Sequence, residues 1–147
     1  NELTDFNIVP DKDGKPTANR VEAGKRPRSS MSPTLIYGPD GKLRLAIGAA
    51  GGVTIPAQVA KAIIGVLDWD LSAREAIALP VIFAPGGDVV FVEQGTTLEA
   101  MIPALQQLGH AQVLARSPSF KATAIERVGN RWRGAADPRS EGAAVAP

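Results

Sequence analysis

The chain of 147 residues contains no cysteine, few aromatic residues and almost no net charge. Without cysteine it can form neither a disulfide nor a thiolate metal site, and the redox state of its compartment stays open. Aromatic residues make up 5% of the chain and its net charge is +1, so neither base stacking nor electrostatics favours a nucleic-acid partner. No apolar run approaches the ~20 residues that span a bilayer, so no membrane span is predicted.

Sequence motifs for binding metals, phosphates or dinucleotides are also missing, so we expect neither a metal nor a cofactor. The single histidine, His110, follows Leu108-Gly109, and we interpret it as an exposed residue at a helix end rather than a member of a Ser-His-Asp triad. The chain begins with Asn1 and shows no secretion signal, which suggests a piece of a longer protein.

Glycine and proline are frequent, at 15 and 12 residues, so much of the chain is expected to form turns and loops. The length and the 44% hydrophobic content suit a single domain over residues 1–147, in which residues 1–33 are mostly loop and residues 135–147 form a tail. Alternating apolar runs and turn residues predict strands at 34–37, 43–47, 81–83, 89–92, 111–115, 123–128 and 131–134.

Helical spacing predicts a helix over residues 55–68, with Thr54 as its N-cap. Its expected core-facing residues are Ala57, Ala60, Ile63, Ile64 and Leu67. A capping box at Ser72–Glu75 begins a short helix that Pro80 ends, and a further helix begins at Thr96-Thr97 and ends at Gly109. These elements predict an α+β fold in which helices cover an antiparallel sheet.

Two groups of hydrogen-bond donors suggest a site for an anionic or carbonyl ligand. Ser29 and Ser30 lie among basic residues and prolines, and their hydroxyls can donate to a carboxylate. Gly51-Gly52 precedes a helix and can present backbone N–H groups as an oxyanion hole, although an ordinary strand-to-helix turn would have the same sequence.

Charged residues near both ends have two interpretations. Glu2 and Asp5, beside Asn1, could bind a substrate ammonium group or form a solvated terminus. Asp137-Pro138-Arg139 predicts a turn with a charge pair, for which a structural role is favoured over a catalytic one.

In order along the chain, these segments resemble the γ-glutamyltransferase (γ-glutamyltranspeptidase) family. Asn1–Phe6 is similar to the family's Asn-(Gln/Glu)-Met-Asp-Asp-Phe segment, and Gly24–Thr34 to its Lys-Arg-Pro-Leu-Ser-Ser-Met-Ser-Pro-Thr signature. Gly48–Gly52 is similar to Gly-Ser-Pro-Gly-Gly. Leu108–His110 and Ala136–Arg139 fit the closing segments, so the resemblance covers almost the whole chain.

The resemblance implies an N-terminal-nucleophile hydrolase fold, a four-layer αββα sandwich of which this chain supplies part. A precursor of this family cuts itself into large and small subunits, and the new N-terminal Thr attacks a γ-glutamyl amide such as glutathione. Water, an amino acid or a peptide then accepts the glutamyl group. The family resemblance also suggests a periplasmic or secreted location.

Carried over by position, Ser29 and Ser30 would hold the donor's α-carboxylate, Glu2 and Asp5 its α-ammonium, and Gly51 and Gly52 would form the oxyanion hole. The chain departs from the family pattern in that Arg28 replaces Leu, Thr4 replaces Asp and Ala49-Ala50 replaces Ser-Pro. The segment Leu79–Phe83 also stands where the family has Ala-Pro-Arg-Phe-His-His. Because of these differences, the resemblance does not determine which donor the enzyme prefers.

The nucleophile of the family would lie before Asn1, so we expect this chain to be a C-terminal part of a small subunit that is inactive alone. It would need the large subunit and the rest of the small subunit as partners. Two alternatives are a non-catalytic glutamyl-binding module and a related acylase that acts on glutaryl-type amides. The apolar surface of half a sandwich predicts that the isolated chain forms a homo-oligomer.

Overall fold

The computed structural model describes residues 3–145, and the chain divides into two units, Asn1–Ser30 and Met31–Pro147. In its described part, the first unit contains one short 3-10 helix, η1 (Leu3–Asp5), and an isolated β-bridge between Asn7 and Arg20. The remainder of this unit is turns and irregular chain, which agrees with the loop predicted there.

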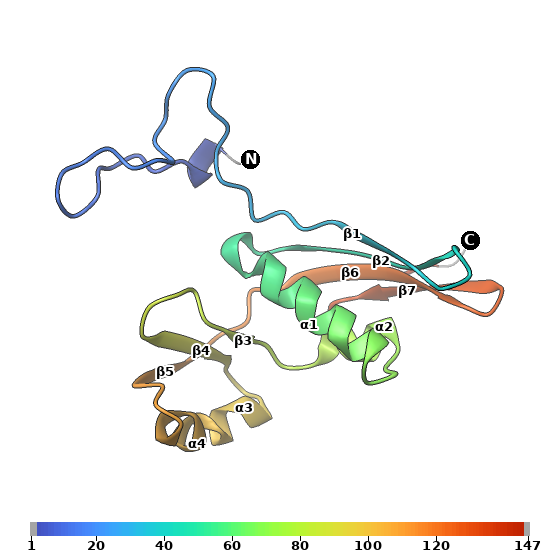
Figure 1. Ribbon diagram of the computed structural model, residues 1–147. Helices are drawn as coiled ribbons and strands as arrows, with labels where there is room; N and C mark the ends of the chain where they lie inside the picture. The colour runs from blue at the N-terminus through green and yellow to red at the C-terminus, as the bar shows by residue number, and fades with distance from the viewer. Residues whose placement is uncertain (1–2, 146–147) are drawn as a thin grey trace. The chain divides into compact units, whose positions relative to one another are not determined.

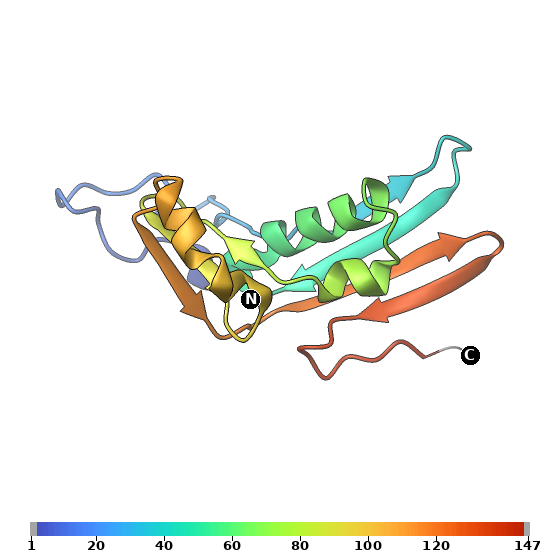
Figure 2. The same cartoon turned by 90° about the horizontal axis from the view of Figure 1, so that it is seen from below.

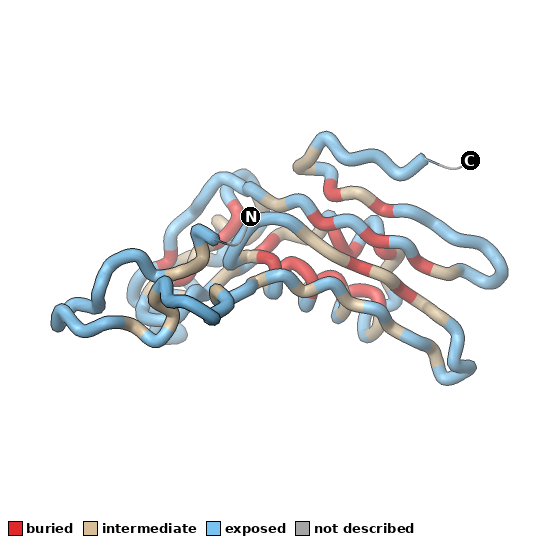
Figure 3. The backbone as a smooth tube through the Cα atoms, turned by 90° about the horizontal axis from the view of Figure 1, so that it is seen from above, coloured by how far each residue is buried: buried red, intermediate tan, exposed pale blue. Residues whose placement is uncertain are grey.

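The second unit is built on a four-stranded antiparallel sheet in the order β1-β2-β6-β7 (Figure 1). Its strands are β1 (Thr34–Tyr37), β2 (Leu43–Ala50), β6 (Lys121–Val128) and β7 (Arg131–Ala136). Every second residue is buried along β6 from Ala122 to Glu126, because successive side chains point to opposite faces of the sheet. Figure 3 shows this alternation along the sheet. Each strand was predicted, and β2 extends three residues further than expected.

Two helices, α1 (Ile55–Leu67) and α2 (Ala73–Ala78), cover one face of this sheet (Figures 1 and 2). The predicted capping box of α2 is present, since the side chains and backbone N–H groups of Ser72 and Glu75 bond reciprocally. The main core lies between the helices and the sheet, and its buried residues are Leu45, Ile47, Ile55, Val59, Ala62, Val66, Ala73, Ala76, Ile77, Ala122, Ala124 and Ala135.

The core-facing side predicted for α1 was only partly right: Ile63 and Leu67 are half-buried and pack against the core. Ala60 and Ile64 are exposed, and the buried residues are Ile55, Gln58, Val59, Ala62, Gly65 and Val66. Apolar residues occur around most of this helix, so spacing alone could not identify the covered face. Thr54 is the N-cap residue of α1, as predicted, but its side chain makes no capping bond to the helix, because its hydroxyl donates to the carbonyl of Gly51 instead.

A smaller three-stranded sheet has the order β3-β4-β5 and consists of β3 (Ile82–Phe83), β4 (Val89–Glu93) and β5 (Gln112–Arg116). The expectation of antiparallel pairing fails between β4 and β5, which are parallel. Parallel neighbours need a crossover connection, and the helices α3 (Thr97–Ala100) and α4 (Ile102–Gln107) supply it. One helix was predicted here, but Pro103 lacks an N–H for a continuous helix, and the break falls at Met101.

The C-terminal segment contradicts the prediction of a tail from residue 135. β7 continues to Ala136, and the side chains of Asp137 and Arg139 are only 2% and 11% exposed. Arg139 bonds to Glu93 at 2.6 Å and to Asp137 at 3.0 Å, which confirms the predicted charge pair. Burial alone would lower the pKa of Arg139, but its bonds to these carboxylates outweigh burial and raise it.

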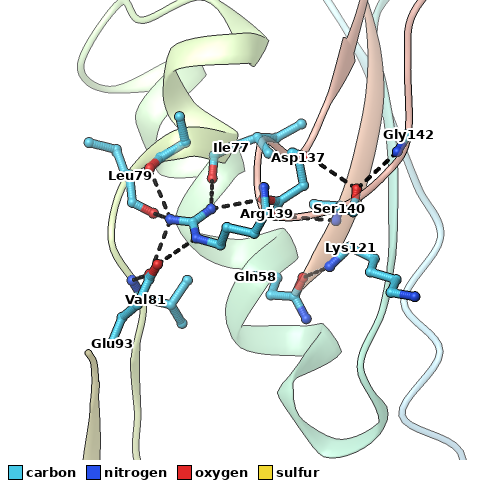
Figure 4. A network of polar contacts seen from close by, with 12 residues as sticks. Gln58, Ile77, Leu79, Val81, Glu93, Lys121, Asp137, Arg139, Ser140 and Gly142 are labelled. Carbon is cyan, nitrogen blue, oxygen red and sulfur yellow. Dashed lines mark hydrogen bonds and ion pairs between the residues drawn. The ribbon is translucent and has the colours of Figure 1, made fainter. Parts of the chain in front are cut away.

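The Arg139 guanidinium also donates to the last carbonyl groups around α2, those of Ile77, Ala78 and Leu79 (Figure 4). Lys61 of α1 donates to the carbonyls of Ile77 and Leu79 as well. Burial, followed by repulsion from Arg139, lowers the pKa of Lys61 to about 8. This cluster of Lys61, Glu93, Asp137 and Arg139 joins the smaller sheet to the main core.

Candidate functional site

In the first unit, the side-chain amide of Asn19 links two segments that the sequence assigned to ligand binding. Its Nδ2 donates to the carbonyl of Asp5 at 2.6 Å, and its Oδ1 accepts from the backbone N–H of Arg28 at 2.9 Å. Arg28 directly precedes Ser29, so one side chain holds the backbone at Asp5 and beside the serine pair. The sequence analysis missed Asn19, because an amide side chain in a long loop is the only feature that could have indicated its role.

Asp5 is half-buried at the end of η1, Ser29 is exposed and Ser30 is half-buried. Within the first unit, Asn19 thus links the backbone of Asp5 to the backbone beside the serine pair. Arg28, which departs from the family signature, is exposed and adds a positive charge next to Ser29. Glu2, the other predicted carboxylate, lies outside the described residues.

Gly51 and Gly52 belong to the second unit, where they connect β2 to α1 through the 3-10 turn η2 (Gly52–Thr54). Their φ angles are +138° and +59°, in a region that residues with a Cβ rarely adopt. A Cβ on Gly51 would lie 2.7 Å from both Gln58 Nε2 and Thr54 Oγ1, whereas one on Gly52 would meet no atom within 4 Å.

Both glycines are exposed, and no hydrogen bond from either N–H is found within residues 3–145. Two consecutive open N–H groups in this type of turn can bind an anionic oxygen. The role of these two N–H groups as oxyanion donors stays a prediction from the sequence.

A cavity of about 230 Å³ borders the Gly51 turn within the second unit. Its walls combine apolar and aromatic side chains with hydroxyl groups and one guanidinium, and they are formed by Gly51, Val53, Thr54, Val81, Phe83, Phe91, Val92, Glu93, Arg116, Ser117, Ser119 and Phe120. The guanidinium of Arg116 lies over the ring of Phe91, 5.1 Å from its centroid. The candidate oxyanion turn therefore forms one wall of a partly aromatic cavity.

His110 is exposed after α4, where its N–H donates to the carbonyl of Leu105, as expected for a residue at a helix end. Among the residues that the structure describes, no group of three His, Asp or Glu side chains is arranged to hold a metal ion. Within the same range, none of the helices has the length and apolarity that crossing a membrane requires.

Comparison with known proteins relates the chain to one family over its full length. The family model for Gamma-glutamyltranspeptidase matches residues 1–147. The glutathione hydrolase proenzymes of Bacillus subtilis (strain 168) and Escherichia coli (strain K12) are each 30% identical, over 99% and 95% of this chain. The chain spans about a quarter of the length of these relatives, 24% and 25% respectively.

Solved structures of the same family have the same fold. The T380A mutant of Helicobacter pylori gamma-glutamyltranspeptidase superimposes with a TM-score of 0.81 at 29% identity, over 95% of this chain and 79% of that chain. The fold is α+β, and the chain supplies part of an N-terminal-nucleophile hydrolase-like αββα sandwich. From its sequence and its fold, the chain belongs to the γ-glutamyltranspeptidase family.

Proposed function

We propose that this chain is the donor-binding part of an enzyme that hydrolyses or transfers γ-glutamyl groups from glutathione-type donors. The observation that carries the proposal is the Gly51-Gly52 turn, which exposes two adjacent N–H groups at the end of β2. These groups would stabilise the negative oxygen that forms when the γ-carbonyl is attacked. Family membership supports this assignment, because the matched relatives from B. subtilis and E. coli are glutathione hydrolases.

In this proposal, the two charged groups on the α-carbon of the donor are bound separately. Ser29 and Ser30 donate to the α-carboxylate, and Glu2 and Asp5 accept from the α-ammonium group. Fixing both groups orients the α-carbon, which limits the positions that the γ-carbonyl can take and so favours its attack. Asn19 supports this arrangement, because it holds the backbone at Asp5 and next to Ser29.

The nucleophile in this proposal is an N-terminal Thr from a segment outside these 147 residues, with its own α-amine as base. Processing of a precursor would supply it, and the matched relatives are named proenzymes. The large subunit and the rest of the small subunit are therefore the proposed partners of this chain. We expect the chain alone to show no turnover of a γ-glutamyl anilide above background.

The test compares γ-glutamyl and glutaryl anilides as donors for the complete enzyme. The glutaryl compound has the carboxylate but lacks the α-ammonium group, so a glutamyl-specific site should give the γ-glutamyl anilide the higher kcat/KM. Equal or better use of the glutaryl anilide would support the acylase alternative. Binding of L-glutamate without turnover of either compound would support the non-catalytic module.

Two substitutions separate the proposed roles of the binding residues. Asp5→Asn should raise KM for the γ-glutamyl anilide and leave KM for the glutaryl anilide unchanged, whereas Ser30→Ala should raise KM for both compounds. Asp13→Asn, in an exposed turn of the same unit, is the matched control and should change neither value. The roles of Asp5 and Ser30 would be wrong if their variants behaved like this control.

A further inference from the structure

Gln58 is a buried amide near the start of an otherwise largely apolar helix. It lies one turn into α1, is 2% exposed, and has both ends of its side chain bonded. Its Oε1 accepts from the N–H of Lys121 at the start of β6 (Figure 4). Its Nε2 donates to the carbonyl of Ala50 at 3.1 Å and to Thr54 Oγ1 at 2.9 Å.

Thr54 continues these contacts to the next peptide group. Its hydroxyl accepts from Gln58 and donates to the carbonyl of Gly51 at 2.9 Å. The carbonyls of Ala50 and Gly51 are therefore both fixed by side chains at the start of α1. Gln58 holds the first directly, and it holds the second through Thr54.

These two carbonyls belong to the peptide groups that carry the candidate oxyanion donors. The carbonyl of Ala50 shares a peptide plane with the N–H of Gly51, and the carbonyl of Gly51 shares one with the N–H of Gly52. In a trans peptide the C=O and N–H point in opposite directions. Because the side chains of Gln58 and Thr54 hold both carbonyls toward α1, both N–H groups point away from it.

We propose that Gln58 is a positioning residue that orients the N–H groups of Gly51 and Gly52 toward the anionic oxygen of the reacting donor. This inference rests on the proposed function, which assigns the oxyanion role to these two glycines. Gln58 itself is buried behind the turn and does not touch the donor. The close approach of its Nε2 to Gly51 also explains why a side chain at position 51 has no room.

The main test is Gln58→Met in the complete enzyme, which keeps the side-chain length but removes both hydrogen-bonding ends. We expect kcat for the γ-glutamyl anilide to fall by about 10-fold to 100-fold, less than the loss of one whole oxyanion donor. KM for the donor should stay within about twofold, because other residues hold its charged groups.

Val66→Ala is the matched control. Val66 is also buried on α1, but it lies near the C-terminal end of this helix, far along the chain from Gly51. It should lower the thermal midpoint while leaving kcat unchanged. If both variants lower kcat to the same extent, the effect of Gln58 is general destabilisation and the proposal is wrong. An unchanged kcat in a folded Gln58→Met enzyme would also overturn it.

Thr54→Val provides a second variant in case Gln58→Met does not fold. It removes the hydroxyl bonds in a nearly isosteric way, so we expect a smaller fall in kcat, again without a change in donor KM. A boronic acid analogue of the γ-glutamyl group gives an independent readout, because its tetrahedral adduct places an oxygen at the N–H pair. Thr54→Val should weaken this inhibitor and leave the inhibition constant of L-glutamate unchanged.

The wild-type enzyme separates this inference from the proposed function. If it shows no acyl transfer, the proposed function fails before Gln58 is tested. If it is active and the variants at Gln58 and Thr54 keep full kcat and full boronate affinity, the positioning role alone is wrong.

Discussion

The residues Gly51 and Gly52 are adjacent but differ in what a side chain would meet. Gly51→Ala would force a Cβ to within 2.7 Å of Gln58 and Thr54 at a φ of +138°, so we expect it to cost about 3 kcal/mol of unfolding free energy. Gly52→Ala meets open space at a φ of +59° and should cost about 1 kcal/mol. Urea unfolding of the two variants checks this order, and equal losses would contradict it.

The half-buried Lys61 should give the stability of the chain a distinctive pH dependence. Its pKa of about 8 lies below the ordinary lysine value of 10.5, so between these values the unfolded chain binds more protons than the folded one. The contribution of Lys61 to stability therefore rises as the pH increases from about 8 to 10.5. After solvent screening, we expect a rise on the order of 1 kcal/mol.

Lys61→Met is the comparison that isolates this effect, because other groups also titrate in alkaline solution. The carbonyls of Ile77 and Leu79 keep Arg139 as a donor in this variant. The difference in unfolding free energy between wild type and variant, measured by urea unfolding from pH 7 to 10, should change in favour of the wild type. A difference that is independent of pH would show that the lysine is not desolvated.

At the residue scale, the sequence identified candidate ligand groups better than the residues that hold them. Gly51-Gly52 and the serine pair could be found because glycine turns and clustered hydroxyls have recognisable chemistry. Gln58 and Asn19 were missed because their roles depend on contacts with distant backbone groups, such as Gln58 with Lys121. The pairing of Arg139 with Asp137 was predicted, but its bond to Glu93, 46 positions away, was not.

Among the secondary-structure elements, α3 begins at the adjacent threonines from which its start was predicted, and it depends on an N-cap there. Thr96 is the N-cap, because its hydroxyl accepts from the N–H of Leu98, and it also donates to the carbonyl of Glu93. Thr96→Ala should lower the unfolding free energy by about 1 kcal/mol. Thr97→Ala is the matched control on the exposed first turn, and thermal unfolding should show a clearly smaller effect.

The strands could be predicted more accurately than the way in which elements meet. Turn residues and alternation located all four strands of the main sheet, since both are properties of a few neighbouring residues. The buried face of α1 and the parallel pairing of β4 with β5 depend on packing between distant segments, so local patterns did not determine them. The break between α3 and α4 had a local signal in Pro103, which the prediction of one helix overlooked.

For the whole molecule, we expect the isolated chain to self-associate. The reason is the apolar face of the main sheet that α1 and α2 do not cover. Leu35, Ile125 and Trp132 are exposed and line a broad groove on this sheet. We expect light scattering to detect dimers or larger species whose fraction grows with concentration. Ile125→Lys should reduce association by placing a charge on this face.

Leu108→Lys is the control for this experiment, because Leu108 is also apolar and exposed but follows α4. It should leave the association unchanged. A wild-type chain that stays monomeric at every concentration tested would contradict the prediction.

The cluster around Arg139 has a consequence for the order of events during protein synthesis. Arg139 neutralises the buried Glu93 and satisfies carbonyls at the end of α2, which are synthesised about 60 residues earlier. Until Arg139 has left the ribosome, Glu93 lacks the guanidinium with which it forms its ion pair, and burying a carboxylate without its partner is costly. The smaller sheet should therefore join the main core late, so that a nascent chain that ends before Arg139 remains sensitive to protease.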